Sequence, residues 1–140
     1  MTMTELLLNV GLTRKNGVSK ERIEEEQTRL YQANRALIPI GYARFLEVSN
    51  GVQTDALSLF GIEKESDESV RDIYENNTLQ GTDTSSDRIF LGDNFREYLV
   101  YDWQKKCYAV IDKQVVNSEK FFPFFEHAML YFLREYIEKV

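Results

Sequence analysis

The sequence contains little of what most catalytic and metal sites need. Its 140 residues include one cysteine, Cys107, and one histidine, His127. One cysteine cannot form an internal disulfide, and one cysteine with one histidine supplies too few ligands for the usual Cys/His zinc clusters. We therefore expect no metal and no cofactor. The motifs G-x-S-x-G, G-x-x-x-x-G-K-[ST], G-x-G-x-x-G and H-E-x-x-H are also absent. This excludes the readily recognised hydrolase, nucleotide-binding and zinc-protease sites.

Long apolar runs are absent as well, so no segment is expected to span a bilayer. The start, Met1 to Leu8, lacks a basic stretch, and its apolar run is too short for a signal peptide. We therefore expect a cytoplasmic protein with no membrane partner. Hydrophobic residues make up 43% and charged residues 29% of the chain, as in globular proteins. One domain is expected over residues 1–140, with residues 1–18 loosely ordered.

The net charge of −6 is concentrated in one segment of the chain. Acids and bases balance in residues 1–62 and again in residues 88–140, whereas residues 63–87 carry eight acids against two bases. We call residues 63–87 the acidic segment. Such a local field attracts basic partners and repels nucleic acid, so we expect a basic protein partner and no nucleic acid. The alternative is a solvated loop that its acidic side chains keep soluble.

Two helices are expected ahead of the strands. Ser19 is a suitable N-cap for the first, over about residues 20–33, and glutamates in its first turns favour the positive end of the helix dipole. The stripe expected to face the core on this helix consists of Ile23, Gln27, Leu30 and Tyr31, with Asn34 one turn on. Pro39 suits the first turn of a second helix that runs to about Ser49. This helix is expected to bury Tyr42, Phe45 and Leu46 and to close at Asn50-Gly51.

The rest of the chain predicts consecutive strands and one closing helix. Strand-like stretches are Val52 to Ile62, Arg88 to Gly92, Tyr98 to Asp102, Lys106 to Ile111 and Lys113 to Val116. A short helix is expected between Asp67 and Asn76, a loop from Thr78 to Asp87, and an aromatic helix from about Phe121. Consecutive strands bounded by helices indicate an α+β fold. We expect a mainly antiparallel sheet of about four to six strands, with two N-terminal helices and a C-terminal helix packed around it.

The stretch from Pro39 to Gly51 has the pattern P-x-x-Y-x-x-F-L-x-x-x-N-G, preceded by an amphipathic helix and followed by a strand. In this order the chain resembles the SUKH superfamily, which includes bacterial immunity proteins and fungal regulators of cell-wall glucan synthesis. Later pieces fit the same order, and the resemblance covers roughly residues 20 to 138. It implies that the matching residues form the fold: Pro39, Tyr42, Phe45, Asn50, Gly51, Gly92 and Asp102.

The resemblance implies a non-enzymatic protein-binding domain with an immunity role. Such a domain binds a polymorphic toxin, of the nuclease or deaminase type, and blocks its active site. The residues expected to face a basic toxin domain are Asp67, Glu68, Asp72, Glu75, Asp83 and Asp87. The alternative role is that of a cell-wall regulator or scaffold, which long disordered flanks usually accompany. A homodimer is also left open.

Two further sets of residues allow more than one interpretation. The first set, at the ends of strand-like stretches, is Asp93, Asp102 and Asp112. Aspartates commonly cap turns at such positions. Paired carboxylates there would instead support a weaker alternative, an unrecognised carboxylate-based enzyme. The aromatic run Phe121, Phe122, Phe124 and Phe125 around Pro123 is expected to fill the space between sheet and helix. The alternative is an exposed apolar patch that contacts a partner or a second copy.

Overall fold

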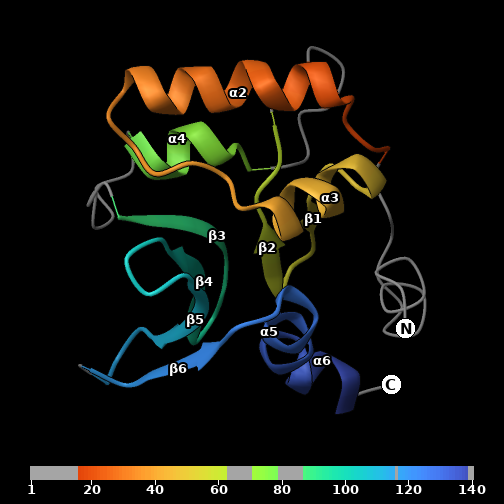
Figure 1. The fold of residues 1–140 in the computed structure, drawn as a ribbon. Coiled ribbons are helices and arrows are strands. Elements are labelled where there is room, and N and C mark those ends of the chain that lie inside the picture. The colour runs from red at the N-terminus through yellow and green to blue at the C-terminus, as the bar shows by residue number, and fades with distance from the viewer. Residues whose placement is uncertain (1–15, 63–70, 79–86, 116, 139–140) are drawn as a thin grey trace.

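The computed structural model describes residues 16–62, 71–78, 87–115 and 117–138 (Figure 1). The helices in these ranges are α2 (Lys20–Gln32), α3 (Ile40–Val48), α4 (Ile73–Thr78), α5 (Phe125–Phe132) and α6 (Arg134–Glu138). The strands are β1 (Val52–Gln53), β2 (Leu57–Leu59), β3 (Arg88–Asn94), β4 (Glu97–Asp102), β5 (Cys107–Asp112) and β6 (Glu119–Phe122). All six strands form one sheet in chain order, and each neighbouring pair is antiparallel. The expected α+β fold is confirmed.

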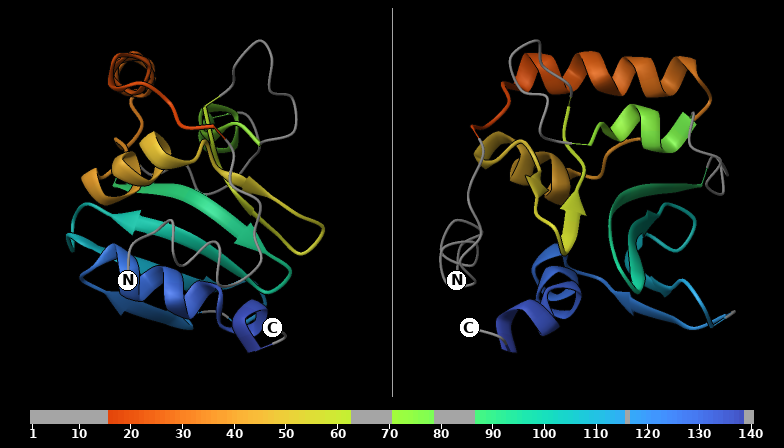
Figure 2. Two further views of the ribbon diagram at one scale, coloured as in Figure 1. Left: turned by 90° about the vertical axis from the view of Figure 1, so that its right-hand side faces the viewer. Right: turned by 180° about the vertical axis from the view of Figure 1, so that it is seen from behind.

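The helices gather at two sides of this sheet. One group consists of the helices that come before β3 in the chain, α2, α3 and α4, and within it α2 lies alongside α4 (Figures 1 and 2). The C-terminal helix α5 packs on β4, β5 and β6. The rings of α3 meet the start of α5 in the core, because the ring centroid of Phe125 lies 5.8 Å from that of Tyr42 and 6.0 Å from that of Phe45. The expected placement of helices around the sheet is therefore also confirmed.

The first helix begins where its sequence predicts. The Ser19 hydroxyl accepts a hydrogen bond from the backbone N–H of Arg22, and Ile23 and Leu30 are buried. Gln27 also faces inward, where its amide exchanges two hydrogen bonds with the backbone of Ile38. Tyr31, expected in the buried stripe, is 72% exposed, so that part of the prediction is wrong. The buried side of α2 is rotated toward Glu26, which is fully buried.

The second helix ties the N-terminal side to the sheet through one buried hydroxyl. Tyr42, Phe45 and Leu46 are buried as predicted. The Tyr42 hydroxyl lies 2.5 Å from the carbonyl oxygen of Phe60 and 3.0 Å from that of Leu91. After the helix, Gly51 has a φ of 78°, a conformation that glycine adopts without a steric penalty. The predicted turn at Asn50-Gly51 is thus present, just beyond the end of the helix.

Three predicted segments differ from the structure. Val52 to Ile62 is not one strand, because Thr54 Oγ1 accepts hydrogen bonds from the N–H groups of Ala56 and Leu57 and turns the chain between β1 and β2. The strand predicted over residues 113–116 is wrong in its described part, residues 113–115, which forms a bend. The helix predicted from Phe121 begins at Phe125 instead, since β6 occupies Glu119–Phe122. Residues 67–70 of the short predicted helix and residues 79–86 of the predicted loop lie outside the described residues.

Glu26 is a buried charge at the contact between α2 and α4. Its carboxylate lies 3.1 Å from Nη1 of Arg29 and 3.8 Å from Nη1 of Arg22. Burial raises the pKa of Glu26 above its ordinary value of 4.5, and the nearby Asp72 charge raises it further, while Arg29 and Arg22 oppose the shift. The loss of hydration therefore outweighs the two ion pairs for this carboxylate.

We expect the Glu26→Gln variant to gain stability relative to the wild type as the pH rises. A carboxyl group whose pKa is higher in the folded chain stabilises the fold below its unfolded pKa, and this stabilisation is lost as the pH rises through the folded pKa. Urea unfolding at a series of pH values from about 4 to about 7 measures the difference between the two proteins. The exposed Glu24→Gln on the same helix is the matched control for the loss of one carboxylate, and the effect at the buried Glu26 should exceed it. A difference that instead favours the wild type as the pH rises contradicts the prediction.

Candidate protein-binding surface

The acidic segment contributes two described and exposed carboxylates. Glu75 is exposed on α4, and Asp87 is exposed immediately before β3. Asp67, Glu68 and Asp83 lie outside the described residues. The carbonyl oxygen of Asp87 accepts a hydrogen bond of 2.7 Å from the backbone N–H of Trp103, which joins the end of the acidic segment to the turn between β4 and β5.

Asp72 does not belong to the exposed surface that the sequence suggested for it. It is only 6% exposed, and its Oδ2 accepts a hydrogen bond of 3.0 Å from the backbone N–H of Glu75. A carboxylate in this position caps the N-terminus of α4 and faces its positive end. We therefore correct the prediction for Asp72, because a helix cap inside the fold is not available to a partner.

Helix α2 presents charges of both signs beside α4. Its Glu21, Glu24 and Glu25 are exposed, as are its Lys20 and Arg29, and α2 runs alongside α4 (Figure 1). In a simple count over residues 1–62, bases balance these glutamates. The acid of α2 that lies near α4 is the buried Glu26, beside Asp72.

An aromatic groove of about 500 Å³ lies between α3, the turn after β4 and the start of α5. Its exposed apolar side chains are Ile40, Trp103 and Phe124, with exposed fractions of 69%, 39% and 62%. Tyr101 and Tyr108 form its inner wall, and Arg44 and Glu126 are its charged lining residues. We call this feature the aromatic groove.

The inner wall of the groove is held in place by ring contacts. The ring centroid of Tyr101 lies 4.9 Å from that of Trp103 and 4.8 Å from that of Tyr108, both in edge-on geometry. The Trp103 indole N–H donates a hydrogen bond of 2.8 Å to the carbonyl oxygen of Leu37. Burial raises the pKa of both Tyr101 and Tyr108, so both phenols remain neutral at neutral pH. The groove therefore presents a fixed and largely apolar wall.

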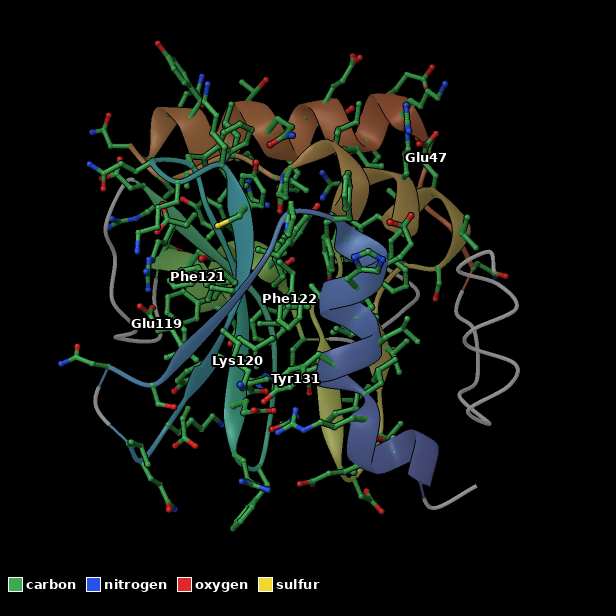
Figure 3. The ribbon with its side chains drawn as sticks, turned by 60° about the horizontal axis from the view of Figure 1, so that its bottom comes forward. Glu47, Glu119, Lys120, Phe121, Phe122 and Tyr131 are labelled. Carbon is green, nitrogen blue, oxygen red and sulfur yellow. The ribbon has the colours of Figure 1, made fainter. Side chains whose placement is uncertain are left out.

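The aromatic run beside Pro123 divides between the two roles considered from the sequence. Phe125 is buried, and the ring centroid of Phe122 lies 5.3 Å from that of Tyr131 between β6 and α5 (Figure 3). Phe121 and Phe124 are 43% and 62% exposed. The ammonium group of Lys105 lies 4.3 Å from the Phe121 ring centroid, so this ring has a charged neighbour. Part of the run fills the core, and Phe124 faces the groove.

A second and larger hollow, of about 810 Å³, lies between the β1–β2 turn, the β3–β4 turn and α6. Its charged side chains largely satisfy one another. Asp93 lies 2.7 Å from Nη1 of Arg71 and 3.1 Å from Nζ of Lys113, and Arg96 lies 2.6 Å from Glu135. Because these groups already have opposite charges beside them, the hollow offers weaker electrostatic attraction to a ligand than its size suggests.

The carboxylates considered for catalysis have structural partners. Asp102 accepts a hydrogen bond from the N–H of Lys105 and pairs with Arg88, and Asp112 accepts hydrogen bonds from the N–H groups of residues 114 and 115. The expectation that these two aspartates cap turns is confirmed. They lie at opposite ends of β5, and Asp93 alone of the three lines the larger hollow.

The single cysteine and histidine have ordinary surroundings. Burial raises the pKa of the Cys107 thiol, which lowers its nucleophilic character. His127 on α5 packs edge-on against Phe124, with ring centroids 5.7 Å apart. Within the described ranges, no three His, Cys, Asp or Glu side chains form a group that could hold a metal ion. Among the helices that the structure describes, none has the length and apolar character needed to cross a bilayer.

Sequence comparison adds no assignment to this geometry. No protein-family model matches the chain, and a search of curated proteins finds no significant match.

Proposed function

We propose that this chain is a non-enzymatic immunity protein that binds a basic polymorphic toxin of the nuclease or deaminase type and blocks its active site. The observation that supports the proposal most is the position of the net charge. The whole formal excess of −6 lies in residues 63–87, and Glu75 and Asp87 of that segment are exposed. The resemblance of residues 39–51 to immunity proteins of the SUKH superfamily supports the same role.

The proposed mechanism is competition for the nucleic-acid site of the toxin. An enzyme that acts on nucleic acid carries a basic cleft that attracts phosphates. A localised acidic surface is drawn to the same cleft and speeds the encounter. Once bound, the domain covers the cleft and excludes the substrate. No catalytic step by this chain is needed for neutralisation.

Growth rescue tests this function. Toxin domains encoded beside the gene are expressed in a bacterial host with and without this chain, and complexes are then purified from rescued cells. We expect one basic toxin domain to be neutralised and to co-purify with the chain in a fixed ratio. Failure to neutralise any neighbouring toxin, or rescue without a complex, overturns the proposal.

Charge reversal on the acidic segment should weaken that complex strongly. We expect Glu75→Lys with Asp87→Lys to lower the toxin affinity by about tenfold or more at low salt, with a smaller loss at high salt. Calorimetric titration at two salt concentrations measures both effects.

The matched control is Asp55→Lys with Glu135→Lys, which changes the net charge equally at exposed residues of the larger hollow. Its effect should stay within about threefold, because the change lies away from the contact. Equal losses for the two double variants would mean that net charge alone matters, and would contradict a defined acidic contact.

A further inference from the structure

We propose that the aromatic groove seats an apolar side chain of the basic partner, in a segment of that partner flanked by lysine or arginine. The inference rests on the proposed function only for the basic character of the partner. The recognition chemistry comes from the groove itself, which combines exposed apolar side chains, a fixed aromatic wall and a link to the acidic segment.

The exposed apolar side chains of the groove are unusually concentrated. Ile40, Trp103 and Phe124 come from three separate elements and border the same hollow, although each has a large exposed fraction. Burial of a large apolar side chain is favourable in proportion to the apolar area removed from water. Exposed apolar clusters with polar rims mark interaction sites, and tryptophan and tyrosine are enriched among the residues that dominate binding.

The wall of the groove is organised before any partner arrives. Trp103 is held by its hydrogen bond to Leu37 and by its edge-on contact with Tyr101. Tyr108 in turn contacts Phe125 in the core, with ring centroids 5.4 Å apart. Side chains that are already fixed lose little conformational entropy on binding, so more of the apolar burial appears as affinity.

The groove is continuous with the acidic segment. Trp103 donates its backbone N–H to the carbonyl oxygen of Asp87, the last residue of that segment. The charged lining residues, Arg44 and Glu126, balance one another, so the negative charge near the groove is that of the adjoining acidic segment, whose Asp87 is exposed. Basic residues beside an apolar side chain in the groove complement that segment.

A second copy of the chain is the competing occupant. Two copies would each bring a net charge of −6 to the contact, which opposes their association at low salt. A basic partner instead gains from the same field. The charge balance thus favours a basic protein over a homodimer in this groove.

Trp103 permits a direct test, because it is the only tryptophan of the chain. The probe is a capped peptide with the sequence Lys-Arg-Leu-Phe-Leu-Arg-Lys, which contains no tryptophan. We expect a saturable blue shift of the Trp103 emission on titration. Two control peptides, one with Gly-Ser-Gly at the centre and one with Glu and Asp as flanks, should bind at least about tenfold more weakly.

Variants locate the binding. Phe124→Ser removes an exposed ring and places a favourable N-cap residue at the start of α5, so the fold should be retained. We expect it to weaken peptide and toxin binding by about tenfold or more. The matched control is Phe95→Ser, at a ring that is 84% exposed in the β3–β4 turn, and its affinity should stay within about twofold.

The outcomes separate this inference from the proposed function. An unchanged Trp103 emission with the basic apolar peptide overturns the inference. So does a dimer, seen by sedimentation, that Phe124→Ser dissociates. If a toxin is neutralised but Phe124→Ser binds it normally, the immunity function stands and the groove assignment fails. If the peptide binds in the groove and no toxin is neutralised, the groove assignment stands and the immunity function fails.

Discussion

Replacing Asn50 with alanine should lower the free energy of unfolding by about 3 kcal/mol. The Asn50 side chain is 1% exposed, donates a hydrogen bond of 2.8 Å to the carbonyl oxygen of Ile62 and accepts one of 2.7 Å from its N–H. Alanine leaves both backbone groups of a buried residue without this partner. Urea unfolding followed by circular dichroism measures the loss.

Two further variants test whether hydrogen bonding is the cause. Asn50→Asp keeps the shape but places a carboxylate oxygen against the Ile62 carbonyl, so it should be at least as destabilising, with partial recovery in acid. Asn94→Ala likewise removes two hydrogen bonds, from the backbone N–H groups of Arg96 and Glu97, but at a half-buried turn residue rather than a fully buried one. It should cost about 1 kcal/mol or less. Equal losses for Asn50→Ala and Asn94→Ala would contradict the account.

Asn50 shows where the sequence was informative and where it was not. The Asn-Gly pair predicts the end of α3, and Gly51 does adopt a positive φ. The partner of the Asn50 amide lies twelve residues further on and has no local signal. Asn77 acts similarly, because its amide bonds both the N–H and the carbonyl oxygen of Phe90 in β3. In a sequence, such buried amides look like ordinary loop residues.

The parts of the fold that were predicted correctly depend on local signals. Ser19 caps the start of α2 as predicted, and Pro39 stands at the N-cap of α3, one residue before the first turn in which it was expected. Both signals need only neighbouring residues. The strands β3, β4 and β5 follow one another through short turns, so apolar stretches between turn residues were sufficient. The local structures that these residues favour persist in the folded protein because the tertiary contacts are compatible with them.

The C-terminal error has a physical cause in Pro123. The aromatic residues from Phe121 to Phe125 fit a helical spacing, and they fit a strand followed by a helix equally well. Proline disfavours helical conformation in the residue before it, so Phe122 takes an extended conformation and pairs with Tyr108 in β5. The helix begins only after Phe124. Weighing the proline against the aromatic spacing would have favoured this boundary.

The sequence alone predicts only part of the candidate surface. Composition alone locates the acidic segment, but it does not reveal that Asp72 points inward and caps α4. The aromatic groove was missed, because Ile40, Trp103 and Phe124 come from three elements that only the folded sheet brings together. A groove of this kind has no sequence spacing, and a tertiary structure is needed to find it.

Replacing Arg134 with methionine should lower the free energy of unfolding by about 3 kcal/mol. Its guanidinium group binds both carboxylate oxygens of Glu97, at 3.0 and 2.9 Å, and Glu97 is only 7% exposed. The same group stacks on the Tyr131 ring at 3.9 Å from the ring centroid. Arg134→Met keeps the apolar stem but leaves a buried carboxylate unpaired at the junction of α5, α6 and β4. Urea unfolding measures the loss of stability.

A surface ion pair in the same region provides the control. Arg96 and Glu135 lie 2.6 Å apart, but both side chains are more than half exposed, so Arg96→Met should cost less than about 1 kcal/mol. Combining Arg134→Met with Glu97→Met should recover most of the loss, because the double variant no longer buries a charge. A double variant as unstable as Arg134→Met alone would show that the packing of the arginine, rather than the stranded carboxylate, accounts for the effect. The measurement therefore separates the cost of a buried unpaired charge from the contribution of the Arg134 contact with Tyr131.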